Sequence, residues 1–176
     1  MTDPWGVPSG WVRRFAHLVA PGGAVLDVAA GGGRHARFFR DRGHDVTAID
    51  RNLDGMAGAE GVELIQADLE AAPWPLPDRP FAGIIVTNYL HRPLLPILLG
   101  ALAPQGGVLI YETFADGQAE FGRPSNPDFL LQPNELLQAA LPGLTVVGYE
   151  HGIVYAPKPA AVQRIAAVAG RRLVPL

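Results

Sequence analysis

Cysteine is absent from this chain of 176 residues, and only 18% of the residues are charged. The lack of cysteine excludes disulfides, thiolate nucleophiles and cysteine-ligated zinc, and it is typical of a reducing compartment. The formal net charge of −3 provides no basic footprint for a phosphate backbone, so we expect no nucleic-acid partner. His17, His44 and His151 are scattered without the spacing of metal ligands, and we expect no metal.

Long apolar runs are also missing. The most apolar run, residues 94–102, is interrupted by Pro96 and is roughly half as long as a membrane span. The N-terminus lacks the apolar core of a signal peptide. We therefore expect a cytoplasmic protein with no membrane partner. The hydrophobic content of 48% is that of a globular protein, and the length fits one domain.

Short β-branched runs alternate along the chain with helical patterns, which predicts an α/β three-layer sandwich: a mostly parallel sheet with helices on both faces. Seven strands are expected, at residues 24–29, 45–50, 62–67, 81–87, 107–113, 144–150 and 161–169. Helices are expected at residues 9–20, 34–42, 93–102 and 133–140, with Ser9 as the first N-cap and Pro96 as a kink. The connection between the last two strands is too short for a parallel crossover, so the last strand should run antiparallel to the sixth.

We expect a single domain over residues 1–176. Within it, residues 1–22 should form an N-terminal helical cap, and residues 115–132 should form a loop on the substrate side.

The glycine run Gly31-Gly32-Gly33 lies between the first expected strand and the helix that begins at Arg34. Glycine allows a tight turn and a close approach of the backbone to a ligand. Ligands of doubly wound sheets bind beyond the carboxyl ends of the strands, where this loop lies. The spacing Gly31-x-Gly33-x-x-Ala36 also fits a dinucleotide fingerprint, so the loop by itself does not choose between cofactors.

Acidic residues stand at the ends of three successive strands: Asp27, Asp50 and Asp68. Asp27 beside a pyrophosphate would be repelled, whereas S-adenosylmethionine carries an ammonium and a sulfonium and no phosphate. Asp50 could accept both ribose hydroxyls, as carboxylates in NAD sites also do. Asp68 could accept from the adenine amino group while Leu69 packs on the ring. Each acid alone also fits a strand-end cap or a surface charge; together with the glycine loop they favour a nucleoside cofactor.

With these residues, nearly the whole chain resembles the Class I, Rossmann-like methyltransferases that use S-adenosylmethionine. Their first motif, acidic-x-Gly-x-Gly-x-Gly, is matched by Asp27-x-Ala29-x-Gly31-x-Gly33, and we expect Ala29 to make its turn with a negative φ. Segments 87–93 and 111–114 are similar to the tellurite-resistance-type bacterial branch. The resemblance implies that S-adenosyl-L-methionine, released as S-adenosyl-L-homocysteine, contacts Asp27, Ala29, Gly31, Gly33, Asp50, Arg51, Asp68, Leu69 and Asn88.

Methyl transfer needs no nucleophilic residue or metal from the protein, because the cofactor carries the activated carbon. The protein aligns the acceptor, excludes water and sometimes removes a proton. The segment after the fourth strand lines the acceptor in related enzymes, which makes Tyr89 and His91 the catalytic candidates. His91 is the candidate general base because the ordinary pKa of histidine lies near neutrality. The other reading of His91 is a helix N-terminal residue bonded to a loop carbonyl.

Acceptor candidates are Tyr89 and two residues near the end of the fifth strand, Glu112 and Phe114. Adjacent strand residues face opposite sides of a sheet, so only one of Tyr111 and Glu112 should reach the site.

In the loop at residues 115–132, we hypothesise that Arg123 or Asn126 binds a polar or anionic acceptor; the other reading is a structural Ω-type loop. Trp5 and Trp11 could form a lid or be buried against the sheet. Arg34 could meet the cofactor carboxylate or face solvent.

The sequence thus predicts methyl transfer from S-adenosylmethionine to a small-molecule acceptor by in-line displacement, in a monomer or homodimer. A non-catalytic module that binds S-adenosylmethionine or S-adenosylhomocysteine is the second reading. An NAD(P)-dependent reductase is the third, because the glycine spacing also fits a dinucleotide.

Overall fold

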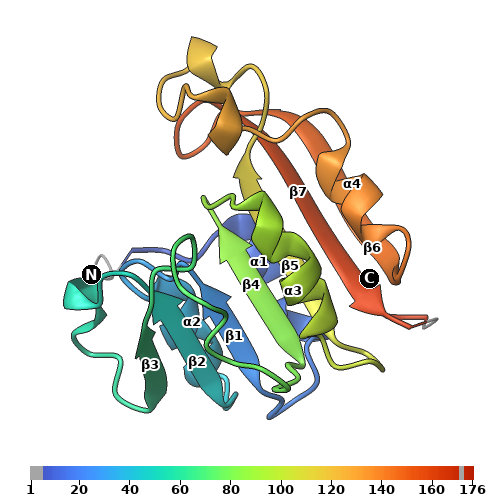
Figure 1. The fold of residues 1–176 in the computed structure, drawn as a ribbon. Coiled ribbons are helices and arrows are strands. Elements are labelled where there is room, and N and C mark those ends of the chain that lie inside the picture. The colour runs from blue at the N-terminus through green and yellow to red at the C-terminus, as the bar shows by residue number, and fades with distance from the viewer. Residues whose placement is uncertain (1–5, 171–172) are drawn as a thin grey trace.

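The centre of the molecule is a seven-stranded sheet in the spatial order β3-β2-β1-β4-β5-β7-β6 (Figure 1). The computed structural model describes residues 6–170 and 173–176. The strands are β1 (Val25–Val28), β2 (Val46–Asp50), β3 (Val62–Gln66), β4 (Gly83–Thr87), β5 (Val108–Phe114), β6 (Leu144–Val154) and β7 (Ala160–Ala169). The expected α/β fold class is confirmed.

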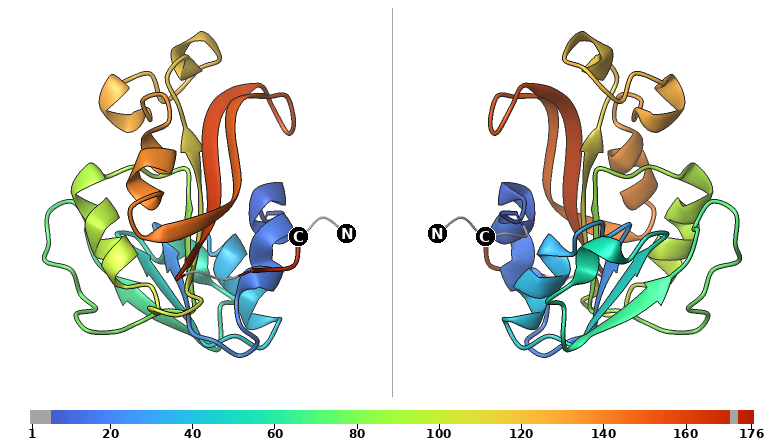
Figure 2. Two further views of the ribbon diagram at one scale, coloured as in Figure 1. Left: turned by 90° about the vertical axis from the view of Figure 1, so that its right-hand side faces the viewer. Right: turned by 90° about the vertical axis from the view of Figure 1, so that its left-hand side faces the viewer.

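Strand β7 runs antiparallel to both of its neighbours, β5 and β6, while β1 to β5 pair in parallel. The expected reversed last strand is therefore confirmed. Strands β6 and β7 have 11 and 10 residues, more than the sequence predicted. The prediction ended β6 too early because the last residues of this edge strand are mostly exposed, so no buried alternation marks them. The β6–β7 hairpin extends beyond the parallel strands and curls over the side that carries α1 (Figure 2).

In the described part of the chain, four short α-helices cover the sheet (Figure 2). Helices α1 (Gly10–Phe15) and α2 (Arg34–Arg40) pack on one face with one apolar cluster, and α3 (Leu95–Gly100) and α4 (Glu135–Ala140) pack on the other with a second. Five 3-10 turns lie between these elements, at Ala16–Leu18, Asp54–Met56, Arg92–Leu94, Gln118–Glu120 and Pro127–Phe129. Among the described residues, none of the helices is long and apolar enough to cross a bilayer.

The N-terminal helix begins as predicted, because the Ser9 side chain accepts hydrogen bonds from the backbone N–H groups of Trp11 and Val12. It is shorter than expected: α1 ends at Phe15 and continues as a 3-10 turn to Leu18. Trp11 is 3% exposed and donates from its indole nitrogen to the Ile165 carbonyl, which is the buried reading of this residue. Trp5, its suggested partner in a lid, lies outside the described residues.

The expected kink at Pro96 is wrong. The region predicted as one helix over residues 93–102 is a 3-10 turn, Arg92–Leu94, followed by α3, which begins at Leu95. Pro96 therefore occupies the first turn of α3, where its missing N–H has no intrahelical partner to lose.

Three residues of the loop after β1 have left-handed backbone: Ala29 (φ 52°), Gly31 (φ 54°) and Gly33 (φ 72°). The expected negative φ at Ala29 is therefore wrong. Alanine occupies a conformation that costs roughly 1–2 kcal/mol for a residue with a Cβ, and the family's glycine would adopt it freely. The turn is imposed by what surrounds it, since the amide of Ala30 bonds to the Ile49 carbonyl of β2.

We predict different costs for two alanine substitutions in this loop. A Cβ at Gly33 would lie 2.5 Å from Met56 Sδ, whereas a Cβ at Gly31 would meet nothing within 4 Å. Gly33→Ala should lower the free energy of unfolding by about 2–5 kcal/mol, from left-handed strain plus overpacking. Gly31→Ala should lower it by about 1 kcal/mol, from strain partly offset by a stiffer unfolded chain. Urea unfolding of both variants measures the difference, and equal losses would contradict the placement of Gly33.

Candidate active site

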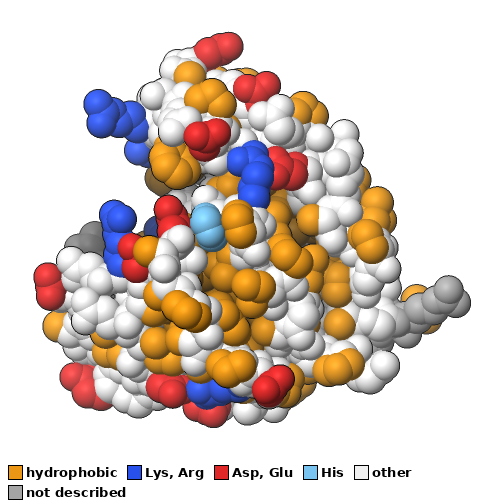
Figure 3. All heavy atoms as spheres, in the orientation of Figure 1, with side chains coloured by type: hydrophobic (Ala, Val, Ile, Leu, Met, Phe, Trp, Pro, Cys, Tyr) orange, Lys and Arg blue, Asp and Glu red, His pale blue; other side chains and the backbone are white. Residues whose placement is uncertain are grey.

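A cavity of about 430 Å³ lies beyond the carboxyl ends of β1, β2 and β3, and its volume is in the usual range for small-ligand sites. We call it the acidic cavity, because three carboxylates and one cation line it. Its lining residues are Ala29, Asp50, Arg51, Ala67, Asp68, Leu69, Glu70, Tyr89 and Phe129. Figure 3 shows the surface hollowed on this side, below the projecting segment that follows β5. The cavity therefore brings together most of the residues predicted to hold a cofactor.

Asp50, the last residue of β2, both supports the glycine loop and faces the acidic cavity. Its Oδ2 accepts from the Gly31 amide at 2.8 Å, and its Oδ1 accepts from the Asn52 amide at 2.9 Å. A carboxylate offers about four acceptor positions, so two remain for a ligand such as a pair of ribose hydroxyls. Asp50 thus fixes the loop and the ligand position together.

The opposite wall of the acidic cavity carries Asp68, Leu69 and Tyr89. The Asp68 Oδ1 accepts from the Glu70 amide at 3.0 Å, which holds the turn after β3. The Tyr89 hydroxyl is buried and has no hydrogen-bond partner among the described residues. Burial and the nearby carboxylates, Glu70 first, raise the pKa of Tyr89 to about 12. Its hydroxyl therefore stays protonated near neutral pH and can donate to a ligand acceptor.

Asp27 supports the glycine loop from below and lines neither this cavity nor the basic cavity defined next. Gly33, the N-cap of α2, has no side chain to accept a hydrogen bond, and Asp27 Oδ2 instead accepts from the Ala36 amide at 2.9 Å. Burial raises the pKa of Asp27 to about 7, although the Ala36 hydrogen bond and the charge of Arg34 oppose this. Asp27 thus ties β1 to the first turn of α2.

A second cavity of about 570 Å³ lies over the carboxyl ends of β4 and β5, between the α1 segment and the β6–β7 hairpin. We call it the basic cavity, because among the described residues its charged lining consists of Arg13, Arg14, Arg34, Lys158 and Arg164 against one acid, Glu112. Asn88 lines the basic cavity and Tyr89 the acidic one, so two consecutive residues after β4 contribute to different cavities. Of the pair Tyr111 and Glu112, Glu112 lines the site, as expected for one of the two; Phe114 also lines it.

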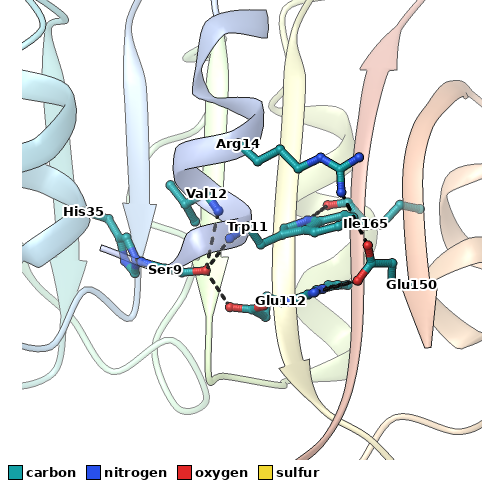
Figure 4. A network of polar contacts seen from close by, with 9 residues as sticks. Ser9, Trp11, Val12, Arg14, His35, Glu112, Glu150 and Ile165 are labelled. Carbon is teal, nitrogen blue, oxygen red and sulfur yellow. Dashed lines mark hydrogen bonds and ion pairs between the residues drawn. The ribbon is translucent and has the colours of Figure 1, made fainter. Parts of the chain in front are cut away.

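His35 and Ser9 connect the N-terminal segment to the rest of the site (Figure 4). The Ser9 amide donates to His35 Nε2 at 3.1 Å, so the ring proton must be on Nδ1. Burial, with the charge of Arg34, lowers the pKa of His35 to about 3, and the ring is neutral. The Ser9 hydroxyl donates to Glu112 at 2.6 Å. One serine thus joins residues 6–9 to α2 and to β5.

Six predicted site residues line neither cavity: Asp27, Gly31, Gly33, His91, Arg123 and Asn126. His91 precedes the 3-10 turn Arg92–Leu94, and its carbonyl accepts from the Leu94 amide. The Asn126 side chain accepts from the Asp128 amide and so caps a short 3-10 turn. The projecting segment instead contributes Phe129, which is 46% exposed, to the acidic cavity.

Sequence reasoning missed several residues of the site. Ala67, Glu70 and Phe129 belong to the acidic cavity, and Arg13 and Lys158 to the basic one. Glu70 and Ala67 flank the predicted Asp68 and Leu69, so a wider window at that strand end would have included them. Arg13 and Lys158 lie far apart in the sequence, and no local pattern links them.

The buried groups predict a pH signature of stability. Between about pH 4 and 7 native Asp27 keeps a proton that the unfolded chain has lost, so its contribution falls as pH rises. Between about pH 3 and 6.5 native His35 stays neutral while the histidine of the unfolded chain gains a proton, so the contribution of His35 to stability rises with pH. In the pH range where both groups act, the two contributions to stability change in opposite directions with pH.

Asp27→Asn removes only the falling contribution. The stability of this variant relative to the wild type should therefore increase by at most about 1.4 kcal/mol per pH unit between about pH 4 and 7. Urea unfolding at several pH values measures this, with Asp45→Asn as the matched control because Asp45 is exposed before β2. Parallel pH profiles of Asp27→Asn and the wild type would contradict the burial of an ionisable group here.

Comparison with known proteins supplies relatives of this fold. No known family profile matches the chain. A demethylmenaquinone methyltransferase of Renibacterium salmoninarum is 29% identical over 150 residues, which cover 77% of this chain and 59% of that protein. The crystal structure of TehB from Haemophilus influenzae superposes with a TM-score of 0.76 at 18% identity and covers 93% of this chain and 63% of TehB.

A third relative is the 1,6-didemethyltoxoflavin-N1-methyltransferase of Burkholderia thailandensis, solved with 1,6-didemethyltoxoflavin and S-adenosylhomocysteine bound. Its TM-score is 0.67 at 22% identity, over 92% of this chain and 76% of that chain. The present chain thus spans less than two thirds of the length of the Renibacterium protein and of TehB. The resemblance inferred from the sequence, tellurite-resistance-type branch included, is confirmed at the level of the fold: the chain has the Rossmann-like fold of the Class I methyltransferases.

Proposed function

We propose that the chain transfers the methyl group of S-adenosylmethionine to a small-molecule acceptor by in-line displacement. The observation that carries this proposal is the acidic cavity at the carboxyl ends of β1 to β3, together with the basic cavity, since the consecutive residues Asn88 and Tyr89 line one cavity each. Two adjoining cavities suit a reaction in which a donor and an acceptor must be aligned. Bound S-adenosylmethionine would supply the activated methyl carbon, whose bond to sulfur breaks as the acceptor's lone pair forms the new bond.

The lining of the acidic cavity fits the nucleoside part of this cofactor. Asp50 would accept from the ribose hydroxyls and Asp68 from the adenine amino group, with Leu69 against the ring. Tyr89 also lines the acidic cavity, and its buried hydroxyl is without a hydrogen-bond partner among the described residues. Three carboxylates against Arg51 favour a cationic ligand and repel a pyrophosphate, which argues for S-adenosylmethionine over NAD(P).

The acceptor side is supported by the basic cavity and by the relatives. The Burkholderia enzyme was solved with a small molecule, 1,6-didemethyltoxoflavin, and the Renibacterium relative is named as a demethylmenaquinone methyltransferase. By analogy we assign a small molecule as acceptor here, with Asn88, Glu112 and Phe114 at its site. The raised pKa of Tyr89 makes this residue a hydrogen-bond donor rather than a base. The general-base role of His91 stays a prediction.

Calorimetry tests the cofactor assignment. S-adenosylmethionine and S-adenosylhomocysteine should bind, and NAD(H) should not. Asp50→Ala should weaken S-adenosylhomocysteine binding by about 1.5–3 kcal/mol, the range for hydrogen bonds to a charged group. The matched control is Asp45→Ala, which removes the same charge near the other end of β2 and should leave the affinity unchanged.

The outcomes separate three functions. Binding of NAD(H) without either sulfur nucleoside would overturn the proposal in favour of a reductase. Binding of both sulfur nucleosides without turnover on a broad acceptor panel would favour a non-catalytic binding module. Equal losses in Asp50→Ala and Asp45→Ala would contradict the assignment of the acidic cavity as the cofactor site.

Several further expectations stay predictions: the single domain over residues 1–176, the cytoplasmic location, and the monomeric or homodimeric state.

A further inference from the structure

The charges of the basic cavity are not balanced within the cavity. Arg164 pairs with Glu112 at 3.0 Å and with Glu150 at 2.5 Å, and Arg14 pairs with Glu150 at 3.4 Å (Figure 4). The three other cations, Arg13, Arg34 and Lys158, have no carboxylate partner among the described residues. In a chain of formal charge −3, this excess of positive charge in a concave site attracts anions.

The unpaired cations come from three separate walls. Arg34 begins α2 and follows the glycine loop directly in the chain, while its side chain lines the basic cavity. Arg13 belongs to α1, and Lys158 lies in the turn of the β6–β7 hairpin, which curls toward α1 (Figure 2). Lys158 is the only lysine in the sequence. Arg13 and Lys158 therefore lie on walls that the glycine loop does not form.

The remaining lining of the basic cavity is largely apolar. Its apolar side chains include Val7, Trp11, Phe114, Val154, Pro157 and Val162. Trp11 is held by its hydrogen bond to the Ile165 carbonyl and by an edge-to-face contact with Phe15, with ring centroids 4.6 Å apart. A rigid apolar wall with cations at its edges suits a ligand that has an apolar body and an anionic group.

We propose that the basic cavity binds an acceptor with an apolar body and a carboxylate, and that Lys158 and Arg13 hold the carboxylate. This inference rests on the proposed function, whose donor occupies the acidic cavity. A carboxylate could also come from the amino-acid part of S-adenosylmethionine, and Arg34, next to the glycine loop, is placed to bind that one. The acceptor's carboxylate is bound by Lys158 and Arg13 instead, so mutation can separate the binding of the two carboxylates.

The single lysine provides a direct probe. Reductive ¹³C-methylation labels Lys158 and the N-terminal amine and keeps the positive charge of the side chain. Benzoate, phenylacetate and octanoate are titrated by NMR, with and without saturating S-adenosylhomocysteine, against the uncharged benzamide, phenylacetamide and octanamide. The carboxylates should shift the Lys158 signal and bind at least about tenfold more tightly than the amides, in the range of a charge-assisted hydrogen bond. Saturation with S-adenosylhomocysteine should leave this binding in place.

Variants assign the two carboxylate positions, and calorimetry gives their affinities. Lys158→Gln and Arg13→Gln should each weaken carboxylate binding about tenfold or more and leave S-adenosylhomocysteine affinity unchanged, and Lys158→Arg should restore carboxylate binding. Arg34→Gln should instead weaken S-adenosylhomocysteine binding. Arg42→Gln is the matched control, because Arg42 packs over Phe38 and lines neither cavity.

Three results would overturn the proposal. The first is that no carboxylate shifts the Lys158 signal at millimolar concentration, and the second is that carboxylates and amides bind with equal affinity. The third is that carboxylate binding is lost in Arg34→Gln and competed by S-adenosylhomocysteine, while Lys158→Gln binds carboxylates as the wild type does. The last result would assign all the cations to the donor. Failure of the proposed function is distinguishable. It would appear as absent S-adenosylhomocysteine binding in the wild type, whereas the carboxylate titration can be carried out without that ligand.

Discussion

The hydrogen bond from the Ala36 amide to the Asp27 carboxylate holds the most demanding turn of the fold. The chain leaves β1 through left-handed residues and enters α2 at Gly33, which has no side chain to cap the helix. Asp27 supplies the acceptor across the loop and fixes the first turn of α2 above β1. Arg34 of that turn lines the basic cavity, and Ala29 of the loop lines the acidic one, so this connection positions residues of both cavities. The arrangement costs the burial of a carboxyl group, as its raised pKa shows.

The two cavities divide the site by charge. Acids at the ends of β2 and β3 surround one half, and cations from α1, α2 and the hairpin surround the other. Ser9 lines the basic cavity and is bonded to the neutral ring of His35, so this contact adds no charge to either cavity. A cationic donor and an anionic acceptor would therefore each find the complementary field, which favours correct placement of both over the reverse.

The parts of this architecture that depend on local pattern were predictable, and those that depend on tertiary contacts were not. Strand ends follow from alternation and from breakers, which is why Asp50, Asp68 and Leu69 were predicted and lie at the acidic cavity. Asp27 was located correctly along the chain, but its side chain turns toward α2, which only the packed structure decides. The backbone of Ala29 was mispredicted because the strained turn is held by β2 rather than by the local sequence. Arg13 and Lys158 line one cavity because the hairpin curls toward α1, and no local sequence pattern predicts that curl.

The N-terminal segment reaches its place through contacts of long sequence separation, such as Trp11 to Ile165, 154 residues apart. Closing so long a loop costs entropy before any contact compensates for it, so such contacts form late in folding. The turn around Asp27 and the strand pairs β1–β2 and β2–β3 involve far shorter separations. We therefore expect the acidic cavity to assemble first during folding and the basic cavity to be completed last. By the same reasoning, partial unfolding of the native protein should begin by releasing α1 from the hairpin, which would open the basic cavity while the acidic one stays formed.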